Sequence, residues 1–539
     1  MNQSHLRFKK IIGFVLTGAL VLGLASCGKS SKGQTAAKKD IVNIGVTDTL
    51  GSLNPLTIDA TEINKYSTAM MFLPLVELNR DIKFEGALAD SVTVSSDNKT
   101  FTIKINANAK WSDGQPVTAD DVAFTITRLC SPVINNTTMS MVALEGTDDS
   151  GFVQAGAATV SGIHIVDDKA LTLTMKSPMN LQTFENSYAR YIMTVPKHVL
   201  GSVSESDLAK YDWFNHPTVV DGPYIATAVD ADHYISYKSN TSYWKGAPHI
   251  SKMNIKILAA SQILSGLKSG EIDFVQPTMA EIAQEDYASI QKLSNVKVTY
   301  SDPVTTQSLF LNTKTLSNEK LRQAILYAID RPMLLKNMLN GKGEIDDGFL
   351  TSVSPYYDSS VKATAYNPTK AKELVKESGW DTSKTLSFYI NSGDATFVNG
   401  SSVIVQELKA VGINAEVHTV DLSTLMEKAG SQDFDMLAVQ YTYAPVDPYP
   451  DVKYLLGGDG SWTNFQSDTV NAALEKIQET SDASVIKQQY TAIDQVVQQQ
   501  VPMINLYVIR SLGAARKNLA NANPNVYGSF TNIQDWQFK

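Results

Sequence analysis

Residues 441–450, YTYAPVDPYP, combine three tyrosines and three prolines with a single carboxylate, Asp447. Aromatic rings can stack on a ligand, and a carboxylate can hold a cationic group. The prolines fix the backbone, so the segment would be rigid. Ordinary packing accounts for each aromatic residue equally well. The composition therefore predicts either the wall of a binding site or a stiff turn.

The block WSDGQPVTADDVAFTITRL, residues 111–129, contains carboxylates close enough in sequence to suggest acid–base chemistry. Each of them also has a local structural role. Asp113-Gly114 is a turn signal, Thr118 suits a helix N-cap, and Asp121 three residues later completes a near capping box. Acidic residues in a first turn also favour the helix dipole. We therefore expect a turn followed by a capped helix.

Catalytic and metal-binding motifs are missing from the sequence. The seven histidines are scattered without H-x-x-x-H or H-E-x-x-H spacing, and no G-x-S-x-G, P-loop or G-x-G-x-x-G motif occurs. Two cysteines cannot form a disulfide framework or a cysteine-based metal site. Cys130 is expected to be a small buried hydrophobic residue. The sequence predicts neither an enzyme nor a resident cofactor or metal.

The elements that would position residues 441–450 alternate between strands and helices. Their expected order is strand 385–391, helix 401–412, strand 413–420, helix 421–430 and strand 434–441. This β-α-β-α-β order predicts a parallel sheet with right-handed crossovers. Ligands of open α/β sheets bind outside the carboxyl ends of the strands. Since residue 441 ends such a strand, the pattern favours a binding wall.

Further helix ends and strands can be predicted from a few neighbouring residues. Asp330 is the expected N-cap of a helix that starts at Arg331, and Asn367 caps a helix that ends at Gly379. Residues 99–106 and 170–176 alternate apolar and polar side chains, the period of half-buried strands. Residues 77–193 are therefore expected to be rich in strands.

Length and charge narrow the class of protein. A chain of 539 residues is too long for one core, and about three domains are expected. The formal net charge is -9, and no basic stripe interleaved with aromatic residues occurs, which argues against nucleic-acid binding.

The first 26 residues have the pattern of an export signal. Arg7, Lys9 and Lys10 precede an apolar run at 11–24, which is short for a membrane span of roughly 20 residues. The following LASC resembles a bacterial lipobox, so we expect cleavage to leave Cys27 as a lipidated first residue; an A-x-A type cleavage with an incidental cysteine is the alternative. Residues 27–40 would be a flexible tether. The protein is expected on the outer face of the cell membrane, or facing a periplasm where an outer membrane exists.

Several ordered blocks carry a family resemblance. They are 111–129, VDGPYIATAVDADHYISYKSNTSYWKG (220–246), SGEIDF (269–274), LRQAILYAIDRPMLL (321–335) and YNPTKAKELVKESGW (366–380). Together they resemble the extracellular solute-binding proteins of peptide ABC transporters, the oligopeptide- and dipeptide-binding lipoproteins of family 5. The resemblance implies a monomeric α/β clamshell of the class II periplasmic-binding-protein type with an additional α+β domain.

The same resemblance implies a division of the chain and a partner. Lobe I would comprise 41–76, 194–305 and 501–539, the additional domain 77–193, and lobe II 306–500. A peptide or other small solute would be trapped as the lobes close about a hinge, and then delivered to the transmembrane subunits of an ABC permease.

The resemblance also implies site residues. Gln440, Tyr441 and Thr442 would pair with the ligand backbone. In peptide-binding relatives a carboxylate three residues before the acid-proline pair anchors the ligand's amino group, and here that position is Ala444. Asp447 itself, or Glu62 beside Ile63 in the other lobe, could replace the anchor. Tyr443, Trp462 and Tyr507 complete the candidate set, with Tyr441 and Tyr449 as further aromatic groups.

The missing anchor leaves alternatives open. The ligand could be a blocked, cyclic or internally bound peptide, or an oligosaccharide, nickel or haem. A surface adhesion or chaperone-like protein that reuses the fold without transport is the alternative from another class.

Overall fold

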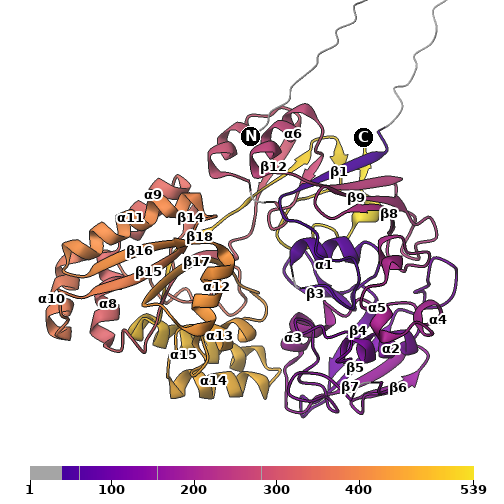
Figure 1. Ribbon diagram of the computed structural model, residues 1–539, viewed down its shortest axis with the longest axis horizontal. Helices are drawn as coiled ribbons and strands as arrows, with labels where there is room; N and C mark the ends of the chain where they lie inside the picture. Colours follow the sequence, from indigo (N-terminus) through magenta and orange to yellow (C-terminus); the bar gives the residue numbers. More distant parts are fainter. Residues whose placement is uncertain (1–38, 60, 155, 281) are drawn as a thin grey trace, which may run out of the picture. The chain divides into compact units, whose positions relative to one another are not determined.

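The computed structural model describes residues 39–59, 61–154, 156–280 and 282–539, and Asp40–Lys539 form one compact unit. Its two large sheets have the strand orders β12-β19-β11-β1-β10-β9-β8 and β14-β18-β13-β17-β15-β16 (Figure 1). A four-stranded sheet has the order β4-β5-β7-β6. Among the described residues, no helix is both long and apolar enough to cross a membrane.

The seven-stranded sheet collects strands from both ends of the chain. Its central strand β1 pairs in parallel with β10 and β11, and its other pairings are antiparallel. The strands are β1 (Ile41–Val46), β8 (Tyr224–Asp230), β9 (Tyr234–Ser239), β10 (Lys252–Ile257), β11 (Phe274–Val275), β12 (Val296–Tyr300) and β19 (Leu512–Arg516). The accompanying helices are α1 (Glu62–Ala69), α6 (Ala260–Ser269), 3₁₀ helix Gln284–Asp286 and α7 (Tyr287–Gln291).

The four-stranded sheet is antiparallel throughout. Its strands are β4 (Ala89–Val94), β5 (Thr100–Ile105), β6 (Ile163–Asp167) and β7 (Ala170–Thr174). The helices of this region and of the segment that follows it are α2 (Ala119–Leu129), α3 (Leu181–Phe184), π-helix Glu185–Ala189, α4 (Lys197–Leu200), α5 (Glu205–Leu208) and 3₁₀ helix Asp212–Asn215. In β5, Phe101, Ile103 and Ile105 are buried, as the alternation predicts. Residues 77–193 are strand-rich, as expected.

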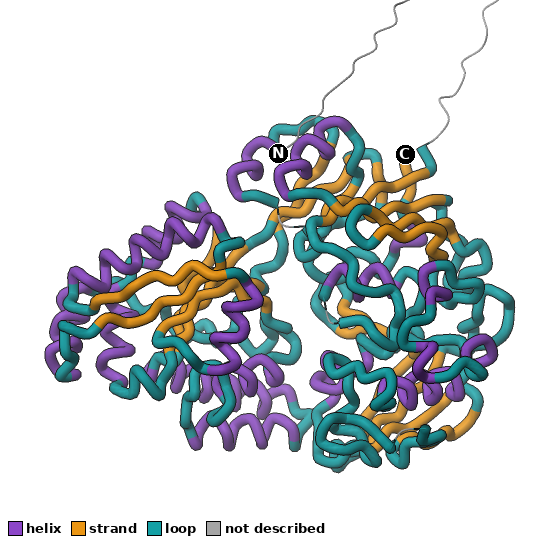
Figure 2. The backbone as a smooth tube through the Cα atoms, in the orientation of Figure 1, coloured by secondary structure: helices purple, strands orange, loops and turns teal. Residues whose placement is uncertain are grey.

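The six-stranded sheet carries helices on both faces (Figure 2). Its strands are β13 (Thr305–Leu311), β14 (Gly343–Glu344), β15 (Thr385–Asn391), β16 (Asn414–Val420), β17 (Met436–Thr442) and β18 (Met503–Ile509). One face packs on α8 (Glu319–Ala328), α9 (Arg331–Leu339), α10 (Pro368–Ser378) and α11 (Ala395–Ala410), and the other on α12 (Leu422–Ser431), α13 (Tyr449–Leu456), α14 (Asp468–Gln478) and α15 (Ala483–Gln500). Leu309 faces the first group of helices and Phe310 the second, because side chains alternate along β13.

Short elements complete the fold. They are the pairs β2 (Val76–Leu78) with β3 (Phe84–Gly86) and β20 (Leu519–Ala520) with β21 (Gln537–Phe538), and the 3₁₀ helix Ile533–Asp535.

The predicted caps are present. Thr118 and Asp121 form a reciprocal capping box at the start of α2, and Asp330 accepts a hydrogen bond of 3.0 Å from the backbone N–H of Met333 in α9. Asn367 caps α10, which ends at Gly379 with a positive φ of 69°. Asp121, the carboxylate of 111–129 in the capping box, therefore has the structural role that its spacing predicts.

The pairings of the six-stranded sheet bear on two expectations. The parallel arrangement expected for the strands of the β-α-β-α-β unit is confirmed by β15, β16 and β17. The sheet as a whole is mixed, because β13 pairs antiparallel with both β17 and β18. The strand 503–509 pairs with β13 in this sheet, whereas the family resemblance implies that 501–539 belong to lobe I. All seven residues of this strand are buried, as expected for an inner strand that pairs with β13.

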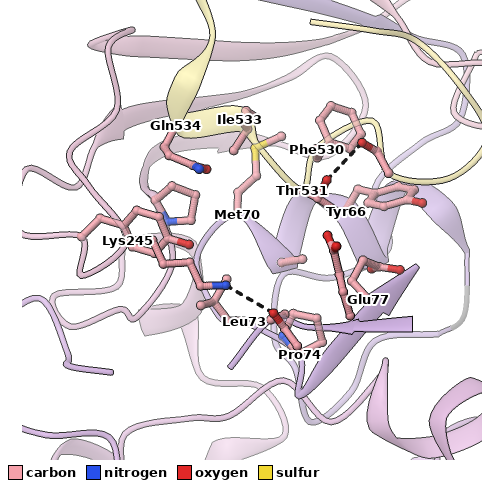
Figure 3. Close-up of a pocket in the computed structure, with 17 residues that line it drawn as sticks. Tyr66, Met70, Leu73, Pro74, Glu77, Lys245, Phe530, Thr531, Ile533 and Gln534 are labelled. Carbon is pink, nitrogen blue, oxygen red and sulfur yellow. Dashed lines mark hydrogen bonds between the residues drawn. The ribbon is translucent and has the colours of Figure 1, made fainter. Parts of the chain in front are cut away.

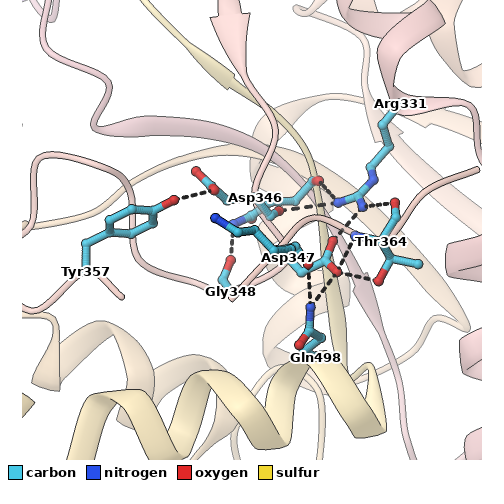
Figure 4. Close-up of polar contacts among 9 residues, drawn as sticks. Arg331, Asp346, Asp347, Gly348, Tyr357, Thr364 and Gln498 are labelled. Carbon is cyan, nitrogen blue, oxygen red and sulfur yellow. Dashed lines mark hydrogen bonds and ion pairs between the residues drawn. The ribbon is translucent and has the colours of Figure 1, made fainter. Parts of the chain in front are cut away.

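A buried ion pair holds the loop after β14 against the six-stranded sheet (Figure 4). Arg331 Nη2 lies 2.5 Å from Asp347 Oδ1, and Arg331 Nη1 donates to the carbonyl of Asn505 in β18 at 3.1 Å. The second Asp347 oxygen accepts from Thr364 N and from Gln498 Nε2 of α15. This part of the block 321–335 therefore has a structural role.

Candidate functional site

Two rows of paired residues form a polar floor on the six-stranded sheet. Tyr507, Gln307 and Gln440 lie opposite one another across β18, β13 and β17, and Ile509, Thr305 and Thr442 form the next row. Directly opposite residues of paired strands point to the same face. The register of β13 against β18 shifts after Gln307, so a bulge lies beside this floor, as is common next to functional sites.

A cavity of about 490 Å³ lies over this floor. The six-stranded sheet and its helices contribute Thr305, Asp394, Gln440, Thr442 and Tyr507, while the part of the chain that carries the other large sheet contributes Asp48, Thr278, Glu285 and Ser511. The volume suits a small ligand. The two large sheets therefore share one cavity.

The strand β17 has a free edge beside this cavity. It pairs with β13 along its whole length, but β15 pairs only with Met436, Leu437 and Ala438. Among the described strands, none pairs with residues 439–442 on that side. A second cavity, of about 200 Å³, is lined by Val439, Gln440 and Asp394 at this edge. An unpaired strand edge offers N–H and C=O groups to an added strand.

The aromatic side chains of 441–450 face away from the cavity floor. Tyr443 and Trp462 are 2% and 3% exposed, and both pack in the core beside α12–α15. Tyr441 lies with its ring 4.9 Å from that of Tyr443 and 6.0 Å from that of Trp462. Alternation along β17 puts odd-numbered side chains on this face, opposite Gln440 and Thr442. We therefore assign Tyr441, Tyr443 and Trp462 to packing rather than to stacking on a ligand.

Asp447 points into the protein. It is 2% exposed and accepts hydrogen bonds from Thr183 Oγ1 at 2.9 Å and Asn186 Nδ2 at 3.4 Å. Burial raises the pKa of its carboxyl to about 7, and the two hydrogen bonds oppose this shift. Asp447 is buried and lines neither of the cavities beside β17, so we do not assign it as a replacement for the missing anchor.

Near Ala444, the structure places a carboxylate that the sequence analysis missed. Asp451 Oδ2 accepts from the backbone N–H of Ala444 at 3.2 Å, and Oδ1 accepts from the Tyr441 hydroxyl at 3.0 Å. Burial raises the pKa of Asp451 to about 6. Its only sequence signal is an acidic residue in the first turn of α13, which is also an ordinary helix feature.

Glu62 and Ile63 have different surroundings, although they are adjacent. Glu62 Oε2 lies 3.4 Å from the hydroxyl of Thr278, which lines the cavity of about 490 Å³. Ile63 is 1% exposed and belongs to the core. Glu62 thus remains a candidate and Ile63 packs inside.

Asp394 is a second carboxylate that the sequence analysis missed. It caps α11 by accepting from Phe397 N at 3.0 Å through Oδ1, and Oδ2 accepts from Gln440 Nε2 at 3.1 Å. Burial raises the pKa of Asp394. The turn at the carboxyl end of β15 was the available signal, because ligands bind at that end of α/β strands.

A smaller cavity of about 80 Å³ lies near α1 and the end of the chain (Figure 3). Met70, Glu77 and Lys245 are among the residues that line it, and Lys245 Nζ donates to the carbonyl of Gly86 at 3.5 Å. Its volume is well below that of a typical ligand pocket.

Among the described residues, no group of three or more His, Cys, Asp or Glu side chains is suited to holding a metal ion. Cys130 is buried, and burial raises the pKa of its thiol to about 12, as expected for a structural cysteine. Cys27 lies outside the described residues.

Comparison with known proteins assigns the chain to a family. Residues 83–463 match the family described as bacterial extracellular solute-binding proteins, family 5 middle, so this chain belongs to that family of non-enzymatic solute-binding proteins. It is 23% identical to the oligopeptide-binding protein AppA of Bacillus subtilis (strain 168), over 96% of each chain.

Solved structures share the fold. The structure of Bacillus subtilis AppA in complex with a nonapeptide matches with a TM-score of 0.74 and 20% identity, covering 93% of this chain and 99% of that one. NikZ of Campylobacter jejuni in complex with Ni(L-His) matches with a TM-score of 0.73 and 20% identity over the same shares. The chain therefore has the fold of these solute-binding proteins, a class II clamshell with an extra domain.

Proposed function

We propose that this protein binds peptides in the cavity of about 490 Å³ and presents them to the permease of an ABC importer. The observation that carries the proposal is the free edge of β17 at residues 439–442, beside that cavity. A peptide added there as a strand gains backbone hydrogen bonds that do not depend on its sequence. Gln440 and Thr442 would then point to the cavity, while Tyr441 holds the strand against the core.

The relatives support a peptide or peptide-like ligand. AppA of Bacillus subtilis is named for oligopeptide binding, and the glutathione-binding protein GsiB of Escherichia coli is 24% identical over 94% of this chain. NikZ holds Ni(L-His), so a non-peptide solute is the alternative within the same fold. The free strand edge favours the peptide, because neither nickel nor a sugar needs an extended row of backbone groups.

The connections between the two large sheets suggest how the site closes. The chain passes between these sheets from β12 to β13 and again from β18 to β19, at residues 301–304 and 510–511. Ser301 N donates to the carbonyl of Ser511 at 2.8 Å, and Ser511 N donates to Ser301 Oγ at 3.0 Å, so the connections lie side by side. Two adjacent short connections are suited to a hinge.

We therefore place the lobe boundaries at these connections. Lobe I would comprise 41–76, 194–304 and 510–539, the additional domain 77–193, and lobe II 305–509. Closure would be a shift in population toward the ligand-bound conformation, with no covalent step.

We further propose that Cys27 carries a lipid anchor after removal of residues 1–26, and that residues 27–40 tether the folded unit outside the cell. The basis is the sequence LASC after an apolar run. Mass spectrometry of the mature N-terminus tests this directly. A mature chain that starts at another residue, or an unmodified Cys27, would refute the anchor.

The peptide proposal is tested with backbone-methylated ligands. A peptide that raises the melting temperature of the mature protein would be remade with N-methyl groups on its odd-numbered or its even-numbered residues. In an added strand, alternate N–H groups face the host. One methylated series should therefore lose binding and the other keep it. Equal binding of both series, or no thermal shift with any peptide pool, would refute strand addition or peptide binding respectively.

A further inference from the structure

The cavity of about 490 Å³ has carboxylates on both of its sides. Asp48 follows β1, and Glu285 lies in the 3₁₀ helix Gln284–Asp286; both belong to the part of the chain that carries the seven-stranded sheet. Asp394 caps α11, on the six-stranded sheet. A ligand held between the two sheets would meet negative charge from both directions.

No basic residue offsets these carboxylates within the cavity. Among the described residues that line it there is no lysine, arginine or histidine. The recorded ion pairs between described residues include none with Asp48, Glu285 or Asp394. A carboxylate that loses water without gaining a cation is strongly disfavoured. A ligand that covers these groups and brings positive charge of its own avoids this cost, whereas a neutral ligand forces the carboxylates to take up protons.

The row of paired residues Tyr507, Gln307 and Gln440 also contains a side-chain amide without a hydrogen-bond partner, that of Gln307. Gln307 is 1% exposed and lies between Tyr507 and Gln440 in the floor row; Tyr507 and Gln440 line the cavity, whereas Gln307 itself is not among its lining residues. Neither its side-chain oxygen nor its side-chain nitrogen has a hydrogen-bond partner in the described part of the chain. Buried polar groups are nearly always paired, so the unpaired amide of Gln307 is an exception, and it lies between two residues that line the cavity.

Asp394 is positioned to hold a cation at the strand edge. Oδ1 is used by the cap of α11, and Oδ2 accepts from Gln440, the residue at the centre of the free edge. A carboxylate oxygen has two lone pairs, so Oδ2 can accept a second hydrogen bond from an ammonium or guanidinium group.

We infer that the preferred ligand is a cationic peptide, which places a lysine or arginine side chain, or its free amino group, against Asp394 in a cavity also lined by Asp48 and Glu285. This inference rests on the proposed peptide function and adds the charge of the ligand. It accounts for the alanine at position 444, because the carboxylate that meets the cation comes from the start of α11 instead.

The test uses pools of pentapeptides that differ in one fixed charge. Acetylated and amidated pools, random at four positions and fixed as Lys, Gln or Glu at the fifth, remove both terminal charges. Calorimetric titration of the mature protein should give the tightest binding for the Lys pool, by about tenfold over Gln, with Glu weakest. Raising the salt concentration should reduce the difference in affinity between the Lys and Gln pools, because salt screens an ion pair that remains exposed to water. The same Gln pool with a free amino terminus shows whether an α-amine serves as the cation.

Asp394→Asn is the matched variant. Asparagine also caps helices through its side-chain oxygen, and its side-chain N–H can donate to Gln440 once the Gln440 amide turns its oxygen toward position 394, so α11 and the floor should be preserved while the charge is lost. The preference for Lys over Gln should then disappear. Asp482→Asn removes the same charge at the same N-cap position of α15, outside this cavity, and should keep the preference.

The outcomes separate the two proposals. Equal binding of the three pools, or an unchanged Lys preference in Asp394→Asn, would overturn the inference and leave the peptide function standing. Failure of every pool, free or blocked, would overturn both. Binding of spermidine without binding of any pool would also overturn both and would assign the cavity to an amine.

Discussion

Thr183 Oγ1 donates a hydrogen bond of 2.9 Å to Asp447 Oδ1, although the two residues are 264 positions apart in the chain. Gln478 Nε2 donates to the same Thr183 hydroxyl at 3.1 Å, and Asn180 Nδ2 donates to the carbonyl of Ile477 at 3.2 Å. The start of α3 is thus bound to the end of α14 and to the loop after β17. Asp447 is a structural residue at this contact.

The pKa of Asp447 gives a prediction about stability and pH. Burial raises the pKa of Asp447 to about 7 in the folded protein, above the usual 3.8. The folded state therefore binds the proton more tightly than the unfolded state, and stability falls as pH rises from about 4 to about 7. Asp447→Asn removes this dependence. It should be more stable than the parent at pH 8 by up to about 4 kcal/mol, since the pKa rises from 3.8 to about 7, and most of that difference should be gone at pH 4.5.

Urea denaturation of both proteins from pH 4.5 to pH 8 measures this difference, because the other titrating groups are common to both. Asp421→Asn is the control without a pH-dependent difference in this range. Hydrogen bonds from Thr424 lower the pKa of the exposed Asp421 below its ordinary value of 3.8, so its contribution is lost only as pH falls below that value. A pH-independent difference for Asp447→Asn would show that Asp447 does not titrate in this range.

The capping box of α2 gives a second prediction. Thr118 Oγ1 accepts from Asp121 N at 3.3 Å, and Asp121 Oδ2 accepts from Thr118 N at 2.9 Å. Thr118→Ala should lower the free energy of unfolding by about 1 kcal/mol, while Thr118→Ser should be near neutral. Asp121→Ala should cost more than Thr118→Ala, because Asp121 also accepts from Lys197 N at 2.9 Å. Equal stability of all three variants would contradict the structural role of these residues.

Cys130 gives a third prediction. The thiol is fully buried, and its raised pKa of about 12 leaves almost no thiolate at neutral pH. In a chain produced from residue 28 onward, Cys130 is the remaining cysteine. Ellman's reagent at pH 8 should therefore react with native protein far more slowly than with protein in 6 M guanidinium. Rapid reaction of the native protein would show that this core opens readily.

Local signals in the sequence predicted the elements well. The caps at Thr118, Asp330 and Asn367 and the order of β15, β16 and β17 follow from hydrogen-bonding side chains and apolar periods within a few residues. Those signals depend on residues within one helical turn or one strand, so they can be recognised without knowledge of the tertiary fold.

The long-range contacts could not be predicted in the same way. Nothing within residues 441–450 shows that Asp447 meets Thr183 or that Tyr443 is buried. Likewise, the seven apolar residues of β18 fit any buried sheet, and only their pairing with β13 assigns them to the six-stranded one. Asp394 was missed because its N-cap position already explains an aspartate, and its contact with Gln440 depends on the tertiary fold.

The buried ion pair of Arg331 and Asp347 gives the last prediction. Their side chains are 2% and 1% exposed, so neither charge has water to compensate for loss of the other. Arg331→Met should lower the free energy of unfolding by about 3–5 kcal/mol, because it leaves Asp347 buried and unpaired. The exposed pair Lys320–Glu377, at 2.9 Å, is the matched comparison, and Lys320→Met should change stability by less than about 1 kcal/mol.

The double variant Arg331→Met with Asp347→Leu separates pairing from packing. If the cost of Arg331→Met comes from the stranded carboxylate, removing that carboxylate should restore part of the lost stability, and the two substitutions should be strongly non-additive. Recovery should be incomplete, because Thr364 N and Gln498 Nε2 lose their acceptor on Asp347. Additive losses in urea denaturation would instead mean that the two side chains stabilise the fold independently, through the backbone groups that each one contacts.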